Sequence, residues 1–210
     1  MDIRCHYPIT LPYEFKPWID LYDPRFGRVK PHEITAEIAV PISELWRHNN
    51  VFCRWLRQQD LVVYTMRMFR SVPNIEYQLH VDVDPTAEQQ IHHAQDAAKY
   101  VYASIVKINF IYHSWGSTMT WYTLKNGSRA ELDLGYSGYT VYKFNKEDCD
   151  QIYHTDCNTA CLINGGRIHT LTNGGNQDSP RLCYSLMLQN RWGTLTWDQA
   201  VKDLSSWLVA

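Results

Sequence analysis

The sequence lacks any long apolar segment of the kind that a membrane-spanning helix needs. None of its 210 residues belongs to a run that approaches about 18 consecutive apolar residues. The first residues, Met1 to His6, also lack the apolar core of a secretory signal peptide. The sequence therefore predicts a cytoplasmic protein without a membrane segment.

An excess of basic charge is also missing. The chain has 20 Lys and Arg against 22 Asp and Glu, a formal net charge of -2. Proteins that hold a nucleic-acid backbone electrostatically rely on concentrated positive charge. The balance therefore argues against a nucleic-acid partner, and no feature of the sequence specifies an oligomeric state.

The cysteines follow no compact framework. There are six of them, at positions 5, 53, 149, 157, 161 and 183. Without an export signal, reduced thiols are expected. Cys149, His154, Cys157 and Cys161 lie close together in sequence, but seven and then three residues separate successive cysteines. Structural zinc sites start from closely paired cysteines, so this spacing favours buried free thiols over zinc.

Internal repeats and low-complexity linkers are absent as well. We therefore expect one domain over residues 1–210, with a β core at about 60–190. Five prolines between Pro8 and Pro31 exclude a long helix there and indicate wrapping segments with short edge strands. A helix from about Ser43 to Gln59 follows, with Ser43 as its cap.

Alternating and β-branched patterns then predict a strand-rich second part. Capping boxes predict a helix over residues 86–99 and a C-terminal helix from Thr196, where Gln199 is the partner, to about Leu208. This content predicts a mainly β jelly roll with flanking α-helices. Its strands are expected at 61–69, 77–85, 101–112, 118–124, 139–144, 159–163, 167–172 and 181–188.

The segment around His80-Val81-Asp82 carries the sharpest chemical signal. Residues two apart in a strand point to the same face, so His80 and Asp82 present an imidazole and a carboxylate side by side. These are two thirds of a facial triad, which leaves coordination positions of Fe(II) open. The alternative is an exposed strand face with two polar residues.

Two residues near the C-terminus strengthen the metal interpretation. His169 lies inside an apolar strand pattern, where an imidazole without a partner is costly. Arg181 begins a further apolar strand, and its planar guanidinium suits a carboxylate. The alternatives are a structural acid beside Arg181 and a backbone partner for His169.

The order His80-x-Asp82, His169 and then Arg181 twelve residues later resembles the Fe(II)/2-oxoglutarate-dependent oxygenase superfamily, in particular its small prolyl-hydroxylase-like members. The resemblance covers about residues 60–190. It implies a double-stranded β-helix, which is a form of jelly roll. The sequence departs from the family at Cys183, where many members have Ser or Thr two residues after the Arg.

The resemblance implies specific roles for these residues. His80, Asp82 and His169 would be the catalytic iron ligands, and Arg181 would bind the distal carboxylate of 2-oxoglutarate. Asn109 and Ser185 are further candidates for contact with 2-oxoglutarate. The aromatic residues Trp115, Trp121 and Tyr122 are expected either to wall the substrate entrance or to pack in the core.

The implied activity is oxidation by O2, with 2-oxoglutarate converted to succinate and CO2. The substrate would be a C-H bond of a peptidyl residue, an amino acid or a small metabolite. Two other classes stay open: a cupin-like metalloprotein without 2-oxoglutarate, and a non-catalytic jelly roll with a binding or structural role.

Overall fold

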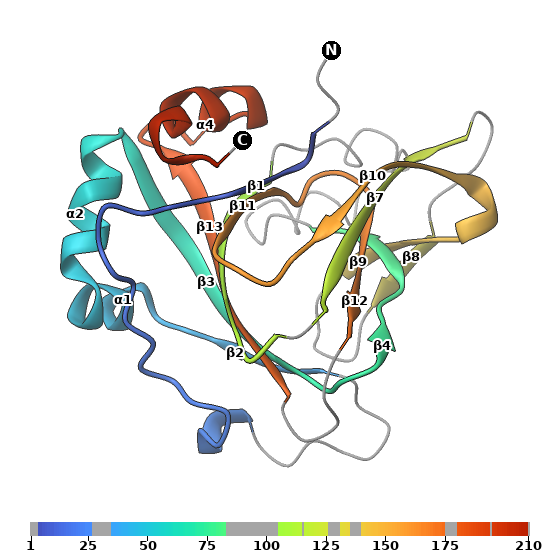
Figure 1. The fold of residues 1–210 in the computed structure, drawn as a ribbon, viewed down its shortest axis with the longest axis horizontal. Coiled ribbons are helices and arrows are strands. Elements are labelled where there is room, and N and C mark those ends of the chain that lie inside the picture. The colour runs from blue at the N-terminus through green and yellow to red at the C-terminus, as the bar shows by residue number, and fades with distance from the viewer. Residues whose placement is uncertain are drawn as a thin grey trace.

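The computed structural model contains two antiparallel β-sheets that face each other (Figure 1). It describes residues 4–26, 35–82, 105–114, 116–125, 131–134, 140–174, 180–193 and 195–209, with only the main chain described at 131–134 and 140–143. The predicted helix over residues 86–99 and Trp115 lie outside this part of the chain. No helix in the described residues is both long and apolar enough to cross a bilayer.

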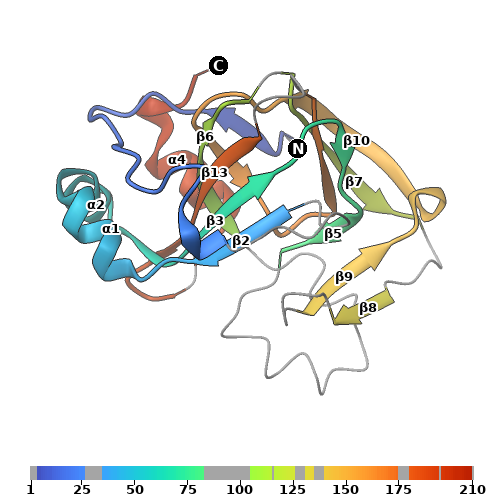
Figure 2. The same ribbon diagram turned by 90° about the horizontal axis from the view of Figure 1, so that it is seen from below.

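The first sheet has the order β1-β11-β6-β13-β3-β2, and the second has the order β10-β7-β12-β5-β9-β8, with β4 paired to β12. Figure 2 shows β8 and β9 at the edge of the second sheet, beyond β5. The strands of the first sheet are β1 (His6–Pro8), β2 (Thr35–Ala39), β3 (Leu61–Ser71), β6 (Val106–Tyr112), β11 (Cys161–Asn164) and β13 (Arg181–Asn190). Those of the second are β4 (Ile75–Glu76), β5 (Leu79–Val81), β7 (Thr118–Leu124), β8 (Glu131–Leu134), β9 (Thr140–Phe144), β10 (Cys149–Asp156) and β12 (His169–Asn173).

The strand order confirms the jelly roll. Eight strands form the jelly roll: β3, β6, β11 and β13 in the first sheet, and β5, β7, β10 and β12 in the second. From one of these eight strands to the next, the chain changes sheet at every step except from β7 to β10. The last two strands insert between earlier ones: β12 lies between β5 and β7, and β13 lies between β3 and β6. This is the double-wound order of a jelly roll, with β1, β2, β8 and β9 added at the edges.

Alternation along β13 separates two environments. Leu182, Tyr184 and Leu186 face the large apolar core, which α1 (Ile42–His48) and α2 (Asn50–Gln58) cover on the outer side of the first sheet (Figure 1). Arg181, Cys183 and Ser185 face the other way, into the space between the sheets. The inner face therefore carries the polar residues, although both faces are buried.

The helix expected over Ser43–Gln59 is two helices, because Asn49 interrupts it. The Asn49 side chain accepts a hydrogen bond from the Lys16 N–H at 2.7 Å and donates one to the Lys16 carbonyl at 3.0 Å. A side chain that binds backbone in this way competes with the helix. The expected Ser43 cap was wrong, since α1 begins after Pro41 without a side-chain cap.

Other differences concern strands at the sheet edges. β8 and β10 were not predicted; β10 exposes alternate polar residues and so lacks an apolar signal. The C-terminal cap was confirmed: the Gln199 N–H donates to Thr196 Oγ1 at 3.2 Å. The helix it starts, α4 (Trp197–Asp203), is shorter than predicted and is followed by a 3-10 turn, η4 (Ser205–Trp207). Among the described residues, 3-10 turns also occur at η1 (Pro24–Phe26) and η3 (Lys146–Asp148).

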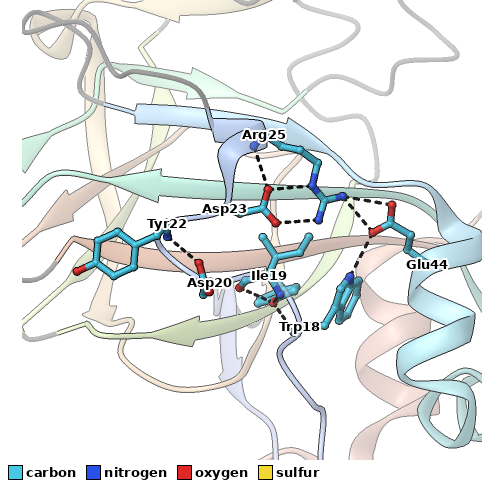
Figure 3. Close-up of polar contacts among 8 residues, drawn as sticks. Trp18, Ile19, Asp20, Tyr22, Asp23, Arg25 and Glu44 are labelled. Carbon is cyan, nitrogen blue, oxygen red and sulfur yellow. Dashed lines mark hydrogen bonds and ion pairs between the residues drawn. The ribbon is translucent and has the colours of Figure 1, made fainter.

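The N-terminal segment is fixed to the helical side of the molecule. Figure 3 shows Arg25 between Asp23 and Glu44 of α1, with nitrogen-to-oxygen distances of 3.0 Å to each carboxylate. The Trp18 indole N–H also reaches Glu44, at 3.3 Å. These ion pairs are partly exposed, so each contributes little to stability.

A buried hydroxyl anchors the same segment more strongly. Tyr184 Oη accepts from the N–H groups of Trp18 (2.8 Å) and Ile19 (2.6 Å) and donates to the Ile19 carbonyl (2.8 Å). We expect Tyr184→Phe to lower the free energy of unfolding by about 3 kcal/mol, because it leaves buried backbone groups unpaired. Urea denaturation measures this, with the exposed Tyr22→Phe as the control. Equal stability of the two variants would contradict the anchoring role.

Candidate metal centre

A cavity of about 100 Å³ lies between the two sheets. Residues from both sheets line it, among them Phe69, Tyr77, Met119 and Leu171. All six residues that the sequence singled out also line it, namely His80, Asp82, Asn109, His169, Arg181 and Ser185. The fold therefore brings together positions that span a hundred residues of sequence.

The pairing of β5 with β12 places the two histidines opposite each other. His169 is the register partner of His80, and their ring centroids are 4.4 Å apart. Asp82 lies two residues after His80, directly after the end of β5. One potential ligand atom from each of the three residues lies within 4.8 Å of the others. This spacing allows all three to bind one metal ion.

Backbone carbonyls set the orientation of both imidazoles. His80 Nδ1 lies 2.8 Å from the Gln78 carbonyl, and His169 Nδ1 lies 2.8 Å from the Arg167 carbonyl. Because a carbonyl can only accept, each Nδ1 carries a proton, and the lone pair left for a metal on the neutral form of each ring is that of Nε2. Metal-binding histidines are commonly held in this way by their second nitrogen.

The Asp82 carboxylate uses its two oxygens differently. Oδ1 forms an ion pair with Lys107 Nζ at 2.6 Å. Oδ2 is buried, has no hydrogen-bond partner among the described residues and lies 3.7 Å from His169 Nε2. Two groups with free electron pairs thus face each other in a buried place, which is costly unless a cation lies between them. The donor set fits a divalent ion such as Fe(II).

Protonation states at neutral pH suit metal binding. Burial alone would raise the pKa of Asp82, but Lys107, then His169 and His80, outweigh it and lower the pKa to about 2. Burial, followed by the proximity of His80, lowers the pKa of His169 to about 4. The carboxylate is therefore charged and the imidazole neutral, which are the forms that bind metals.

The low pKa of His169 predicts an acid-sensitive metal-free protein. Its pKa is below the ordinary value of 6.5, so the unfolded chain binds the proton more tightly and stability falls as the pH drops from 6.5 to 4. The loss reaches about 3 kcal/mol, at 1.36 kcal/mol per pKa unit. The free energy of unfolding should depend less on pH between 6.5 and 4 in His169→Gln than in the wild type. The exposed control His154→Gln should show the wild-type dependence. A parallel decline in His169→Gln would refute the assignment.

Gly165 is packed against the acidic ligand. The Asp82 N–H donates to the Gly165 carbonyl at 3.0 Å, and the Gly165 N–H donates to the Ile105 carbonyl at 2.8 Å. A Cβ at position 165 would lie 2.2 Å from Asp82 Oδ2. The sequence identified Gly165 only as part of a turn, but the structure shows that any larger residue there would push against the Asp82 carboxylate.

We expect Gly165→Ala to weaken divalent metal binding at least tenfold, since the added methyl displaces the carboxylate. Calorimetric titration of the metal-free protein measures the change. Gly116→Ala is the control: a Cβ there meets open space, but Gly116 has a φ of 67°, so the variant is strained without touching the site. Equal losses in both variants would assign the effect to general destabilisation.

The other end of the cavity is arranged for an anion. Arg181 is buried, with 3% exposure, and forms no ion pair with a carboxylate of the described residues. Its Nε also lacks a hydrogen-bond partner there. On the neighbouring strand, Asn109 is the register partner of Ser185, and its Oδ1 is similarly unpaired. A small polar ligand could satisfy these groups.

The structure adds one residue that the sequence did not assign and decides between the two alternatives for the aromatic residues. Lys107 had no assigned role, although a lysine within the apolar run of β6 was a usable signal. Trp121 is fully buried and donates its indole N–H to the Asn164 carbonyl at 2.9 Å. Tyr122 is buried too, so both aromatics follow the core alternative and not the entrance one.

The four residues that lie close in sequence, Cys149, His154, Cys157 and Cys161, do not come together as one site. His154 Nδ1 lies 2.8 Å from Thr120 Oγ1, and Cys149 lies at the opposite end of β10 from Cys157. All six cysteines are described, and each is buried and free of disulfide bonds, as predicted. Cys157 and Cys161 do meet, with their sulfurs 3.8 Å apart.

Comparisons with known proteins identify no family for this chain. No family model matches it, and no curated protein matches it in sequence. Among solved structures, one of oxalate oxidase is similar with a TM-score of 0.33 and 13% identity, covering 92% of this chain and 77% of that chain. Oxalate oxidase in complex with the substrate analogue glycolate gives 0.34 and 11%, covering 97% and 90%. Similarity at this level does not indicate an activity.

Proposed function

We propose that the protein is an Fe(II)- and 2-oxoglutarate-dependent dioxygenase that hydroxylates a C-H bond. The observation that carries this proposal is that Asp82 Oδ2, which has no hydrogen-bond partner among the described residues, lies within metal-sharing distance of His80 and His169. The same cavity contains a buried guanidinium without a carboxylate partner among the described residues. A metal ligand set and an anion-binding group in one small cavity match the needs of this chemistry.

His80, Asp82 and His169 would hold the iron. When bound, Fe(II) and 2-oxoglutarate supply an O2-dependent oxidation that releases succinate and CO2. The chain itself fixes the ligands: the carbonyls of Gln78 and Arg167 hold the imidazoles, and Lys107 holds one carboxylate oxygen. That last contact leaves a single Asp82 oxygen for the metal.

Arg181 would bind the distal carboxylate of 2-oxoglutarate. A bidentate guanidinium–carboxylate pair is strong in a site without water. Asn109 and Ser185 lie side by side on β6 and β13 and would contact the same molecule. The apolar side chains of Phe69, Met119 and Leu171 would keep water from the reacting groups.

The substrate proposed from the resemblance is a peptidyl residue, a free amino acid or a small metabolite. A second candidate function is a cupin-like metalloprotein without 2-oxoglutarate. The observation that favours it is the environment of Arg181, whose guanidinium lies near the thiols of Cys183 and Cys157. Internal sulfur could then replace an external carboxylate as its partner.

The decisive experiment measures 2-oxoglutarate binding and turnover. The iron-loaded protein should bind 2-oxoglutarate without O2 and, with O2 and a panel of peptides and amino acids, release succinate. His80→Ala should abolish both, whereas His154→Ala should not, although His154 begins a second His-x-Asp sequence, on β10. Iron binding without 2-oxoglutarate binding would support the second candidate and overturn the first.

A further inference from the structure

A second cluster of metal-binding side chains lies away from the His80 site. It consists of His6 on β1, Cys157 just after β10 and Cys161 on β11. One potential ligand atom of each residue lies within 4.8 Å of the others. Exposure is 3% for His6 and 0% for both cysteines. We refer to these three residues as the thiol cluster.

The backbone holds the thiol cluster rigidly. β1 pairs with β11 such that His6 is opposite Ile163 and Pro8 is opposite Cys161, so His6 and Cys161 are diagonal neighbours on one face. Cys157 follows β10 of the second sheet, and its N–H donates to the carbonyl of Ser117, which precedes the neighbouring strand β7, at 2.7 Å. The donors are therefore positioned by sheet hydrogen bonds and not by a flexible loop.

Two features of the thiol cluster point to a ligand. His6 Nδ1 is buried and has no well-formed hydrogen bond within the part of the chain that the structure describes, although the His6 ring lies next to the Cys157 thiol. A buried nitrogen in this state costs free energy. The sulfurs of Cys157 and Cys161 are 3.8 Å apart, and both lie within 4.8 Å of a ring nitrogen of His6. Thiolates and an imidazole are the donors that thiophilic metal ions select over carboxylate-binding ones.

We propose that His6, Cys157 and Cys161 bind one thiophilic d10 metal ion, Zn²⁺ or Cu⁺. Binding displaces the thiol protons and forms two metal–sulfur bonds and one metal–nitrogen bond, without any change of oxidation state. The ion would satisfy the His6 ring. The proposal does not rest on the dioxygenase, because no ligand residue is shared between the two sites, but the sites are neighbours: the Arg181 guanidinium of the cavity lies near Cys157 and Cys161.

Trp121 connects this site to the cavity. Its ring centroid is 6.3 Å from that of His6 and 6.3 Å from that of His169. The indole is fully buried, and its N–H donates to the Asn164 carbonyl. A metal ion that fixes His6 would therefore stabilise the position of Trp121, which packs against His169. This is the role of a structural ion.

The test uses the full chain with Asp82→Asn to remove the first site. The reduced, metal-free protein is titrated without O2, separately with Zn²⁺, Cu⁺ and the spectroscopic substitute Co²⁺. We expect one equivalent of Zn²⁺ or Cu⁺ to bind, and Co²⁺ to give a thiolate-to-metal charge-transfer band. X-ray absorption of the zinc form should show two sulfur neighbours at about 2.3 Å.

Variants then assign the ligands. Cys157→Ser and Cys161→Ser should each remove the charge-transfer band, and His6→Gln should weaken binding at least tenfold. Cys53→Ser on α2 is the control, since this buried thiol belongs to the helical core. A metal site without sulfur neighbours, a band that survives loss of both cysteines, or a Cys157–Cys161 disulfide in the isolated protein would overturn the proposal.

Discussion

Asp82→Asn is expected to abolish ferrous-ion binding and to reduce succinate release at least a thousandfold. The amide keeps the shape of the side chain but loses the charge that complements the cation. Its N–H groups can also bond to the free Nε2 of His169, which lies 3.7 Å from Asp82 Oδ2, and so fill the ligand position with a hydrogen bond. Anaerobic iron titration and a succinate assay measure the two effects.

Lys107 complicates the Asp82 experiment and also provides its control. Removal of the Asp82 charge leaves a buried ammonium without its 2.6 Å partner, which could destabilise the whole site. The double variant Asp82→Asn with Lys107→Met removes that cost and should still fail to bind iron. Lys107→Met alone should still bind iron, but more weakly, because Asp82 keeps its carboxylate and loses the ion pair that orients it. Iron binding by the double variant would show that Asp82 is not a ligand.

The parts of the fold that sequence predicted are those with runs of apolar, aromatic and β-branched residues. β7 was predicted at its observed bounds, and β3 and β13 nearly so, because such runs are typical of strands that lie buried or half-buried on both faces. β10 was missed because its side chains are largely exposed. Asn49 breaks the predicted helix through a contact with Lys16, and a local pattern does not contain a contact 33 residues away.

The candidate site divides in the same way. The geometry of a strand makes His80 and Asp82 neighbours, so that pair was readable from two positions alone. The constraint on Gly165 depends on a carboxylate more than 80 residues earlier in the chain, and only the packing reveals it. His6 joins Cys157 and Cys161 through the pairing of an N-terminal edge strand with β11, which sequence spacing could not indicate.

Arg181→Met is expected to weaken 2-oxoglutarate binding by about 30-fold or more, because loss of one partner of a buried charge pair costs 2–5 kcal/mol. Iron affinity should be unchanged, since Arg181 is not among the three ligand residues. Anaerobic titration with each ligand separates the two effects. The exposed Arg191→Gln, just beyond the far end of β13, should change neither affinity.

The stability of Arg181→Met tests whether the guanidinium has an internal partner. Removal of one partner from a buried ion pair leaves the other charge buried and unpaired, which lowers the free energy of unfolding by about 3–5 kcal/mol. Arg181 has no carboxylate partner among the described residues, so the ligand-free variant should unfold at a temperature equal to or above that of the wild type. 2-Oxoglutarate with iron should then raise the wild-type unfolding temperature above that of the variant. A variant that is much less stable without ligand would assign Arg181 to the fold and not to the anion.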